Sequence, residues 1–210
     1  MKKLKIIMIF VLVILFVFLP LPASDVLVKV HFAMDDETAN ITGTSGSIYY
    51  STIDLFGFNG EQCVHSVMDE EKQMLTFRLD KELEKTLQGL RIDLPAVQGL
   101  VCVDNITVSS GGIVCKQFNP CELFSESNRL VTNDIDSISL IKSRKKAYMA
   151  VSGTDPYIVL SGDVVAKVRD CYSHYTLTRI FICVFLLGVW WMDKKKVFDL
   201  GADTLQKESE

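Results

Sequence analysis

The stretch Val26-Leu27-Val28-Lys29-Val30-His31-Phe32 indicates the fold class. After its first residues, apolar side chains alternate with Lys29 and His31. In a strand, successive side chains point to opposite faces of the sheet, so this period of two puts one apolar face inward. The stretch therefore predicts a β-strand with one buried and one exposed face.

Similar short segments recur along the chain, rich in β-branched and aromatic residues and separated by Gly, Asn, Asp and Ser. Only residues 80–88 favour a short helix or a charged loop. Many short strands without alternating helices are typical of an antiparallel sandwich. We therefore predict an all-β, jelly-roll-like antiparallel β-sandwich. The predicted strands after the first are 47–53, 74–79, 90–94, 100–103, 106–108, 135–140, 147–151, 157–160 and 164–168.

Two apolar segments flank this region. Residues 6–23 carry no charge and follow a basic start at residues 1–5, so they predict a transmembrane helix acting as a signal anchor, or a signal peptide cleaved after Ala23. Residues 175–192 contain one charge, Arg179, and predict a second transmembrane helix. The alternative for the second segment is an amphipathic or buried C-terminal helix.

Basic residues predict the orientation of the chain in the cell membrane. Lysines lie in residues 1–5 and again at the start of the tail, residues 193–210. Positive flanks prefer the cytoplasmic side of a bilayer. Both termini are therefore expected in the cytoplasm if the first segment is uncleaved, with residues 24–174 extracytoplasmic and the lipid bilayer as a partner.

Composition excludes some functions. The 210 residues include 22 Lys and Arg against 26 Asp and Glu, a formal net charge of -4. Nucleic-acid binding needs clustered basic residues, so it is not expected. The three histidines lack metal-ligand spacing, and no phosphate-binding loop or nucleophile motif occurs. We therefore expect a protein that is not an enzyme.

Residues 90–95, 99–108 and 153–158 carry a family resemblance. They resemble the jelly-roll extracytoplasmic domains of bacterial membrane proteins in cell-surface polysaccharide assembly, which include glycosyltransferase-type proteins; Leu94 between Asp93 and Pro95 departs from that pattern. The resemblance implies a glycan-recognition or scaffolding accessory, with surface polysaccharide or a membrane glycosyltransferase as partner. The alternatives are a protein-interaction or sensor module without sugar binding, and a fragment of a polytopic glycosyltransferase.

Four residues are candidates for ligand binding. Tyr49 and Tyr50 offer aromatic platforms for sugar rings, whereas Arg91 and Asp93 are two apart and share one strand face. Residues 24–174 contain no Trp, which weakens stacking recognition. Ligand binding is therefore predicted at these four residues, with core packing as the alternative for the aromatic ones.

A metal and a disulfide are weaker expectations. The acidic loop Asp35-Asp36-Glu37 is a candidate for a structural calcium, since this ion prefers oxygen ligands, or is simply a solvated turn. No other cofactor is expected. Outside the apolar segments an odd number of cysteines remains, and a bridge among Cys102, Cys115 and Cys121 is plausible in an oxidising compartment. The cysteines in that region are Cys63, Cys102, Cys115, Cys121 and Cys171.

Overall fold

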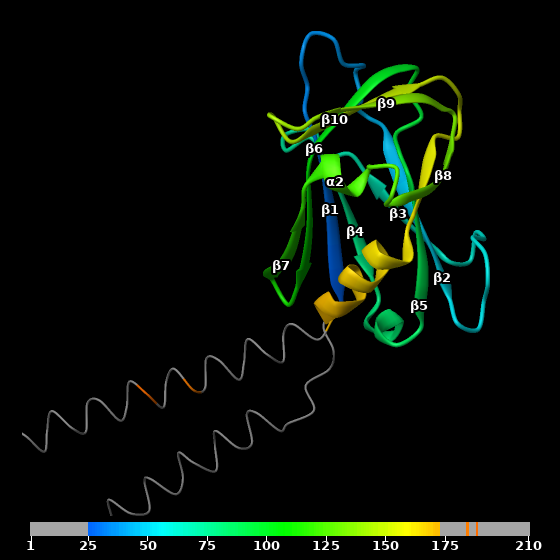
Figure 1. Cartoon of the computed structure of the whole chain (residues 1–210), viewed down its shortest axis with the longest axis vertical. Helices are drawn as coiled ribbons and strands as arrows, with labels where there is room; N and C mark the ends of the chain where they lie inside the picture. Colours follow the sequence, from blue (N-terminus) through cyan, green and yellow to red (C-terminus); the bar gives the residue numbers. More distant parts are fainter. Residues whose placement is uncertain (1–24, 173–183, 185–187, 189–210) are drawn as a thin grey trace, which may run out of the picture. The chain divides into compact units, whose positions relative to one another are not determined.

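Antiparallel strands account for about half of residues 25–172, which belong to one compact unit of the chain. The computed structural model describes these residues together with residues 184 and 188. The strands form two sheets (Figure 1). The prediction of an all-β antiparallel sandwich is therefore confirmed.

The first sheet, sheet A, has the order β4-β1-β6-β10-β9, and β7 pairs with β6 beside this path. Neighbouring strands in sheet A are all antiparallel. Its strands are β1 (Val26–Phe32), β4 (Met74–Leu79), β6 (Gly99–Ser110), β7 (Ile113–Phe118), β9 (Ile135–Ile141) and β10 (Lys146–Val151).

The second sheet, sheet B, has the order β3-β2-β5-β11-β8 and is also antiparallel throughout. The chain crosses between the two sheets repeatedly, so both contribute to one core. The strands of sheet B are β2 (Ser45–Thr52), β3 (Cys63–Val67), β5 (Leu87–Asp93), β8 (Arg129–Asn133) and β11 (Tyr157–Leu160).

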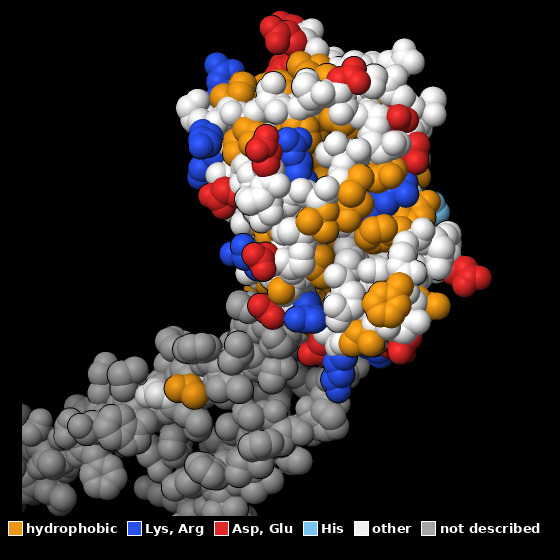
Figure 2. All heavy atoms as spheres, turned by 45° about the vertical axis from the view of Figure 1, so that its right-hand side comes forward, with side chains coloured by type: hydrophobic (Ala, Val, Ile, Leu, Met, Phe, Trp, Pro, Cys, Tyr) orange, Lys and Arg blue, Asp and Glu red, His pale blue; other side chains and the backbone are white. Residues whose placement is uncertain are grey.

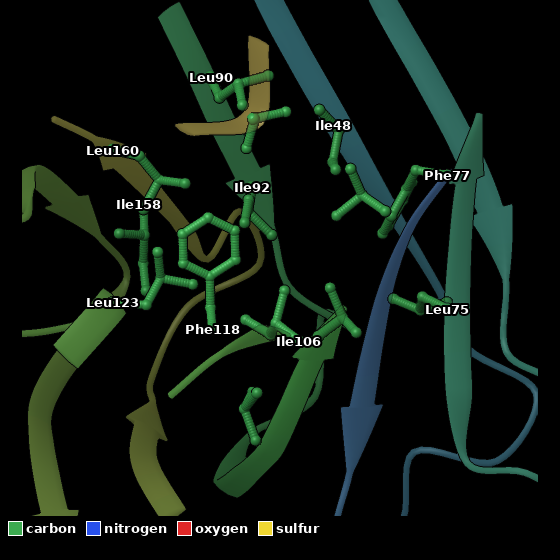
Figure 3. Close-up of a cluster of buried hydrophobic side chains, with 14 of the residues drawn as sticks. Ile48, Leu75, Phe77, Leu90, Ile92, Ile106, Phe118, Leu123, Ile158 and Leu160 are labelled. Atoms are coloured by element: carbon green, nitrogen blue, oxygen red, sulfur yellow. The ribbon is translucent and has the colours of Figure 1, made fainter. Parts of the chain in front are cut away.

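The core lies between the two sheets. Every second residue of β1 is buried, as its period-two pattern predicts, and the same side of β4 contributes Phe77 at 0% exposure. In Figure 3, Phe118 lies among Ile92, Leu123 and Ile158, which come from three other elements. Side chains from both sheets and from α2 (Pro120–Leu123) therefore form one apolar layer.

One predicted strand is wrong. Residues 164–168 lie in a helical segment that covers residues 162–172. Their valines are β-branched, which favoured a strand, but Val164, Val165, Val168, Cys171 and Tyr172 are buried at helical spacing. Burial of this stripe outweighs the β-propensity of valine. The segment helps to close the core, since Val164 and Val168 meet side chains of both sheets there.

Other differences concern element bounds. The two segments 100–103 and 106–108 form the single strand β6, and residues 80–88 contain only the 3-10 helix η1 (Lys81–Glu84) before β5 begins. Strands β3, β7 and β8 have mostly exposed or half-buried residues. Their sequences lack the apolar alternation that identified the other strands. These three strands were therefore not predicted from the sequence.

Both predicted membrane segments, residues 6–23 and 175–192, lie outside the continuous stretch of described residues. Among the residues that the structure describes, no helix has the length and apolar character needed to cross a bilayer.

Removing the Phe77 side chain tests the role of the core. We expect Phe77→Ala to lower the free energy of unfolding by about 3–5 kcal/mol, because the ring is fully buried and its loss leaves a cavity. Chemical unfolding of the full-length chain, followed by circular dichroism, measures this. Phe56→Ala is the control: that ring is 87% exposed, so its loss should change the free energy by less than about 0.5 kcal/mol. Equal effects would contradict the assigned core.

Candidate functional site

The outer face of sheet B brings several polar and aromatic side chains together. On the adjacent strands β2 and β5, Tyr49 lies opposite Arg91. On β5 and β11, Tyr157 lies opposite Asp93. Their neighbours Ile48, Leu90, Ile92 and Ile158 are buried, so strand alternation directs these four side chains to the outer face.

The guanidinium of Arg91 lies close to two tyrosine rings. Its central carbon is 3.7 Å from the ring centroid of Tyr157 and 4.8 Å from that of Tyr49. Both distances are within the range of cation–π attraction. Only 17% of the Arg91 side chain is exposed, so the two rings and the sheet hold it in place.

Two carboxylates bind the same guanidinium. Nε and Nη2 of Arg91 donate to the two oxygens of Asp93 at 2.7 and 2.9 Å, a bidentate pair. Nη2 also donates to Asp155 at 3.1 Å. Bidentate pairs of this kind are both stronger and more directional than a single hydrogen bond. Arg91 therefore links β2, β5 and β11 with the turn that carries Asp155.

Burial and charge act against each other in this group. Burial disfavours the charged guanidinium, but hydrogen bonding and charge attraction from Asp93, with Asp155, outweigh it and raise the pKa of Arg91. Burial raises the pKa of Asp93 above its usual value, and the opposing effect of Arg91 is too small to reverse this. Arg91 therefore stays charged, and Asp93 holds a proton more readily than an exposed aspartate.

A second group adjoins this one on β2 and β3. Ser47 Oγ lies 2.7 Å from Nδ1 of His65, and the Cys63 sulfur lies 3.6 Å from Nε2 of the same ring. A hydrogen bond with Cys63, together with burial, raises the pKa of Tyr49. The hydroxyl end of Tyr49 is thus linked to the Cys63–His65 group while its ring contacts Arg91.

Asp155 reaches Arg91 because a turn holds it there. The carboxylate of Asp134 accepts from the backbone N–H of Asp155 at 2.9 Å, and Asn133 donates to the carbonyl of Asp155 at 2.8 Å. Gly153 allows the close approach, because an added Cβ would lie 2.0 Å from the Asp134 carboxylate. The turn at Asp155 and Pro156 thus leaves the Asp155 side chain available for Arg91.

Exposed apolar side chains surround this polar group. Val67 on β3 is 73% exposed and Val131 on β8 is 51% exposed. Figure 2 shows hydrophobic side chains gathered in a band across this side of the molecule, with basic side chains set among them. We use the name sheet B face for five residues and the exposed apolar side chains around them. The five residues are Tyr49, Arg91, Asp93, Asp155 and Tyr157.

Three of the four predicted ligand residues lie together on this face: Tyr49, Arg91 and Asp93. Tyr50 does not, because it follows Tyr49 directly in β2 and packs against the core. Tyr157 is not one of the four predicted ligand residues. Its place in the 153–158 motif, at the start of a predicted strand, is the sequence signal for it.

The acidic loop lies elsewhere. Asp35, Asp36 and Glu37 line a cavity of about 470 Å³ beside Tyr148 and Arg144. Tyr148 donates to Asp35 at 3.0 Å, and this bond is the main reason why the pKa of Tyr148 rises to about 12. Within the described residues, no group of three or more metal-ligating side chains is arranged to hold a metal ion. The structure therefore adds no support to the calcium prediction.

Replacing Arg91 by lysine tests the geometry of the group. Lysine keeps the charge but has no planar fork for the bidentate pair and no flat surface for the rings. We expect Arg91→Lys to lower the free energy of unfolding by about 1–3 kcal/mol. The control is Arg78→Lys, an arginine with a 74% exposed side chain paired to Asp25, with an expected change below about 1 kcal/mol. Chemical unfolding measures both, and equal effects would contradict the assigned geometry.

The raised pKa of Asp93 predicts a pH dependence. The folded chain binds this proton more tightly than the unfolded chain, whose aspartate titrates near about 3.9. The contribution of Asp93 to stability therefore falls as the pH rises from about 3.9 through its folded pKa. We expect the stability of the wild type relative to Asp93→Asn to decrease over that window, as measured by unfolding at successive pH values. The opposite slope would show that Arg91 dominates.

The contacts described above define the site. No family model, curated protein or solved structure matches this chain.

Proposed function

We propose that the chain is a non-enzymatic recognition module, held at a membrane by its two apolar segments, and that its extracytoplasmic sandwich binds a glycan on the sheet B face. The observation that carries this is Arg91, fixed between the rings of Tyr49 and Tyr157 and bonded to two aspartates. Such a group is already in place before any ligand arrives, which reduces the entropic cost of binding.

The group offers hydrogen-bond donors and acceptors side by side. Arg91 has five N–H donors, and within residues 25–172 the two on Nη1 have no hydrogen-bond partner. Each aspartate oxygen has further lone pairs, and the Asp155 side chain is 59% exposed. A pair of neighbouring sugar hydroxyls both donates and accepts, so it matches this arrangement.

Charge narrows the class of glycan. One guanidinium and two carboxylates leave the group with a formal charge near -1 when both aspartates are ionised. Like charges placed close together are unfavourable, so acidic sugars are disfavoured. The proposed ligand is therefore a neutral glycan, bound weakly because the sandwich offers tyrosine rather than tryptophan rings.

Two finer features belong to the same proposal. A jelly-roll-like path is supported by the repeated crossing of the chain between sheets A and B. Membrane attachment through residues 6–23 and 175–192 is supported by their apolar composition and by the basic residues beside them. Together these features would display the sheet B face outside the cell as an accessory of surface polysaccharide assembly.

A partner protein is the second candidate, favoured by the exposed apolar side chains around the face. Val67 and Val131 beside the face are 73% and 51% exposed. Tyrosine and arginine are common anchors of protein interfaces, and apolar neighbours exclude water around them. On this alternative the same face would bind a protein and have no affinity for sugars.

Calorimetry on the full-length chain in detergent tests the glycan proposal. The probes are cellohexaose, maltohexaose and mannohexaose, with hexagalacturonate as the acidic comparison. We expect saturable binding of at least one neutral probe with a Kd on the order of 1 mM and no binding of the acidic one. Tyr157→Ala should weaken binding about tenfold, because losing a stacking ring costs about 1.4 kcal/mol, which corresponds to a tenfold change in Kd.

Tyr148→Phe is the matched control, since this tyrosine lies on sheet A and is bonded to Asp35. It should bind like the wild type. Absence of binding by a folded chain at 10-fold the expected Kd, about 10 mM, would overturn the glycan proposal. A photo-crosslinking residue at Val131 would then test the protein alternative: discrete protein adducts in membranes of the native host, lost in Tyr157→Ala, would support it.

A further inference from the structure

Cys115 lies at an irregular point in β7. Along the β6–β7 pairing, Lys116 lies opposite Val108 and Val114 lies opposite Ser109, so Cys115 is the extra residue of a β-bulge. A bulge redirects a side chain relative to the regular alternation. Cys115 is half-buried and packs against the core, whereas Val114 and Lys116 beside it are exposed. The bulge therefore turns the Cys115 thiol inward.

Cys171 approaches from the helical segment 162–172. It belongs to the buried stripe of that segment and is only 4% exposed. Its thiol lies 3.2 Å from the carbonyl oxygen of Lys167, one turn earlier in the helix. Burial, followed by the neighbouring Cys115, raises the pKa of Cys171 to about 12. The thiol is therefore protonated and held against the core.

The two cysteines meet although they are 56 positions apart. The sulfur of Cys115 lies 3.8 Å from the backbone carbonyl oxygen of Cys171. The other cysteines in the described part have different neighbours: Cys63 contacts His65, Cys102 contacts Tyr148, and Cys121 contacts the carbonyl of Lys146. Within residues 25–172, Cys115 and Cys171 are thus the two cysteines that lie against each other.

We propose that Cys115 and Cys171 are a disulfide-forming pair that joins β7 covalently to the helical segment 162–172. This replaces the bridge among Cys102, Cys115 and Cys121 expected from sequence spacing. The inference does not depend on what binds the sheet B face. The five cysteines of the described residues are not joined by disulfides in the structure.

The oxidant is a disulfide, either a small one such as oxidised glutathione or that of a thiol–disulfide oxidoreductase. The more accessible Cys115 attacks first as a thiolate, breaks the oxidant's S–S bond and releases one of its halves as a thiol. The Cys171 thiolate then attacks the Cys115 sulfur of the mixed disulfide and releases the second half. Overall the two protein thiols lose two electrons, the oxidant gains them, and the two protons pass to the released thiols.

A covalent link here would stabilise an edge of the sandwich. Among the described strands, β7 pairs with β6 alone, and the helical segment follows β11 in the other sheet. Closing a long loop of chain restricts the unfolded state and raises stability. We expect the oxidised chain to melt roughly 5–10 °C above the reduced chain.

Peptide mapping of the full-length chain tests the pairing. The chain is reduced, exposed to a mixture of reduced and oxidised glutathione, treated with N-ethylmaleimide to block free thiols, and digested with trypsin. We expect a linked pair of peptides, residues 92–116 with residues 170–179. Because the first peptide also contains Cys102, the link should persist in Cys102→Ser and vanish in Cys115→Ser.

Thermal unfolding supplies the second measurement. The difference in Tm between the oxidised and reduced chain should persist in Cys102→Ser and vanish in Cys115→Ser, which changes a half-buried residue and so has less effect on folding than a change at Cys171. Maleimide found on both Cys115 and Cys171 after oxidation would overturn the proposal, as would a link from Cys171 to another cysteine.

Discussion

Alternate side chains of β1, β4 and β6 point into the space between the sheets, and their removal from water is the interaction on which the other features depend. Val28, Phe77 and Val108 are each at most 4% exposed, and each contributes about 1.5–3 kcal/mol through burial. Because the period of a strand is two, a slip by one residue would expose the whole set. The same requirement fixes the outward residues: with Ile48 and Ile92 inside, Tyr49 and Arg91 must face out.

The sheet B face combines this constraint with electrostatics. Arg91 is the one positive charge in a group that includes Asp93 and Asp155, and its contacts with two tyrosine rings add attraction without adding charge. Removing the arginine would leave Asp93 half-buried with no cation beside it. Removing a ring would leave the ion pair intact. Arg91 therefore compensates the half-buried Asp93 carboxylate, and the rings are the part of the face most free to contact a ligand.

Local sequence patterns predicted the fold where burial is one-sided. The alternation in residues 26–32 and 74–79 identified β1 and β4 with the same bounds as the structure. The strand predicted at residues 164–168 was wrong because this short stretch, with three valines, does not show that burial continues with helical spacing to Tyr172. For the site, the spacing of Arg91 and Asp93 predicted a shared face. Tyr157 and Asp155 lie more than 60 positions further on, and only the pairing of β5 with β11 brings them there.

Four of the five residues that define the sheet B face lie on the middle strands of the sheet, and Asp155 comes from the turn before β11. Strands β2, β5 and β11 are each hydrogen-bonded on both sides, and their opposite faces are packed into the core. A ligand on such a surface finds it ready-made and leaves it almost unchanged. Binding there would not transmit a signal through a conformational change. Binding would instead change the location of the protein, by holding it on the polymer. A polymer with many equal sites would also concentrate many copies of the chain along its length.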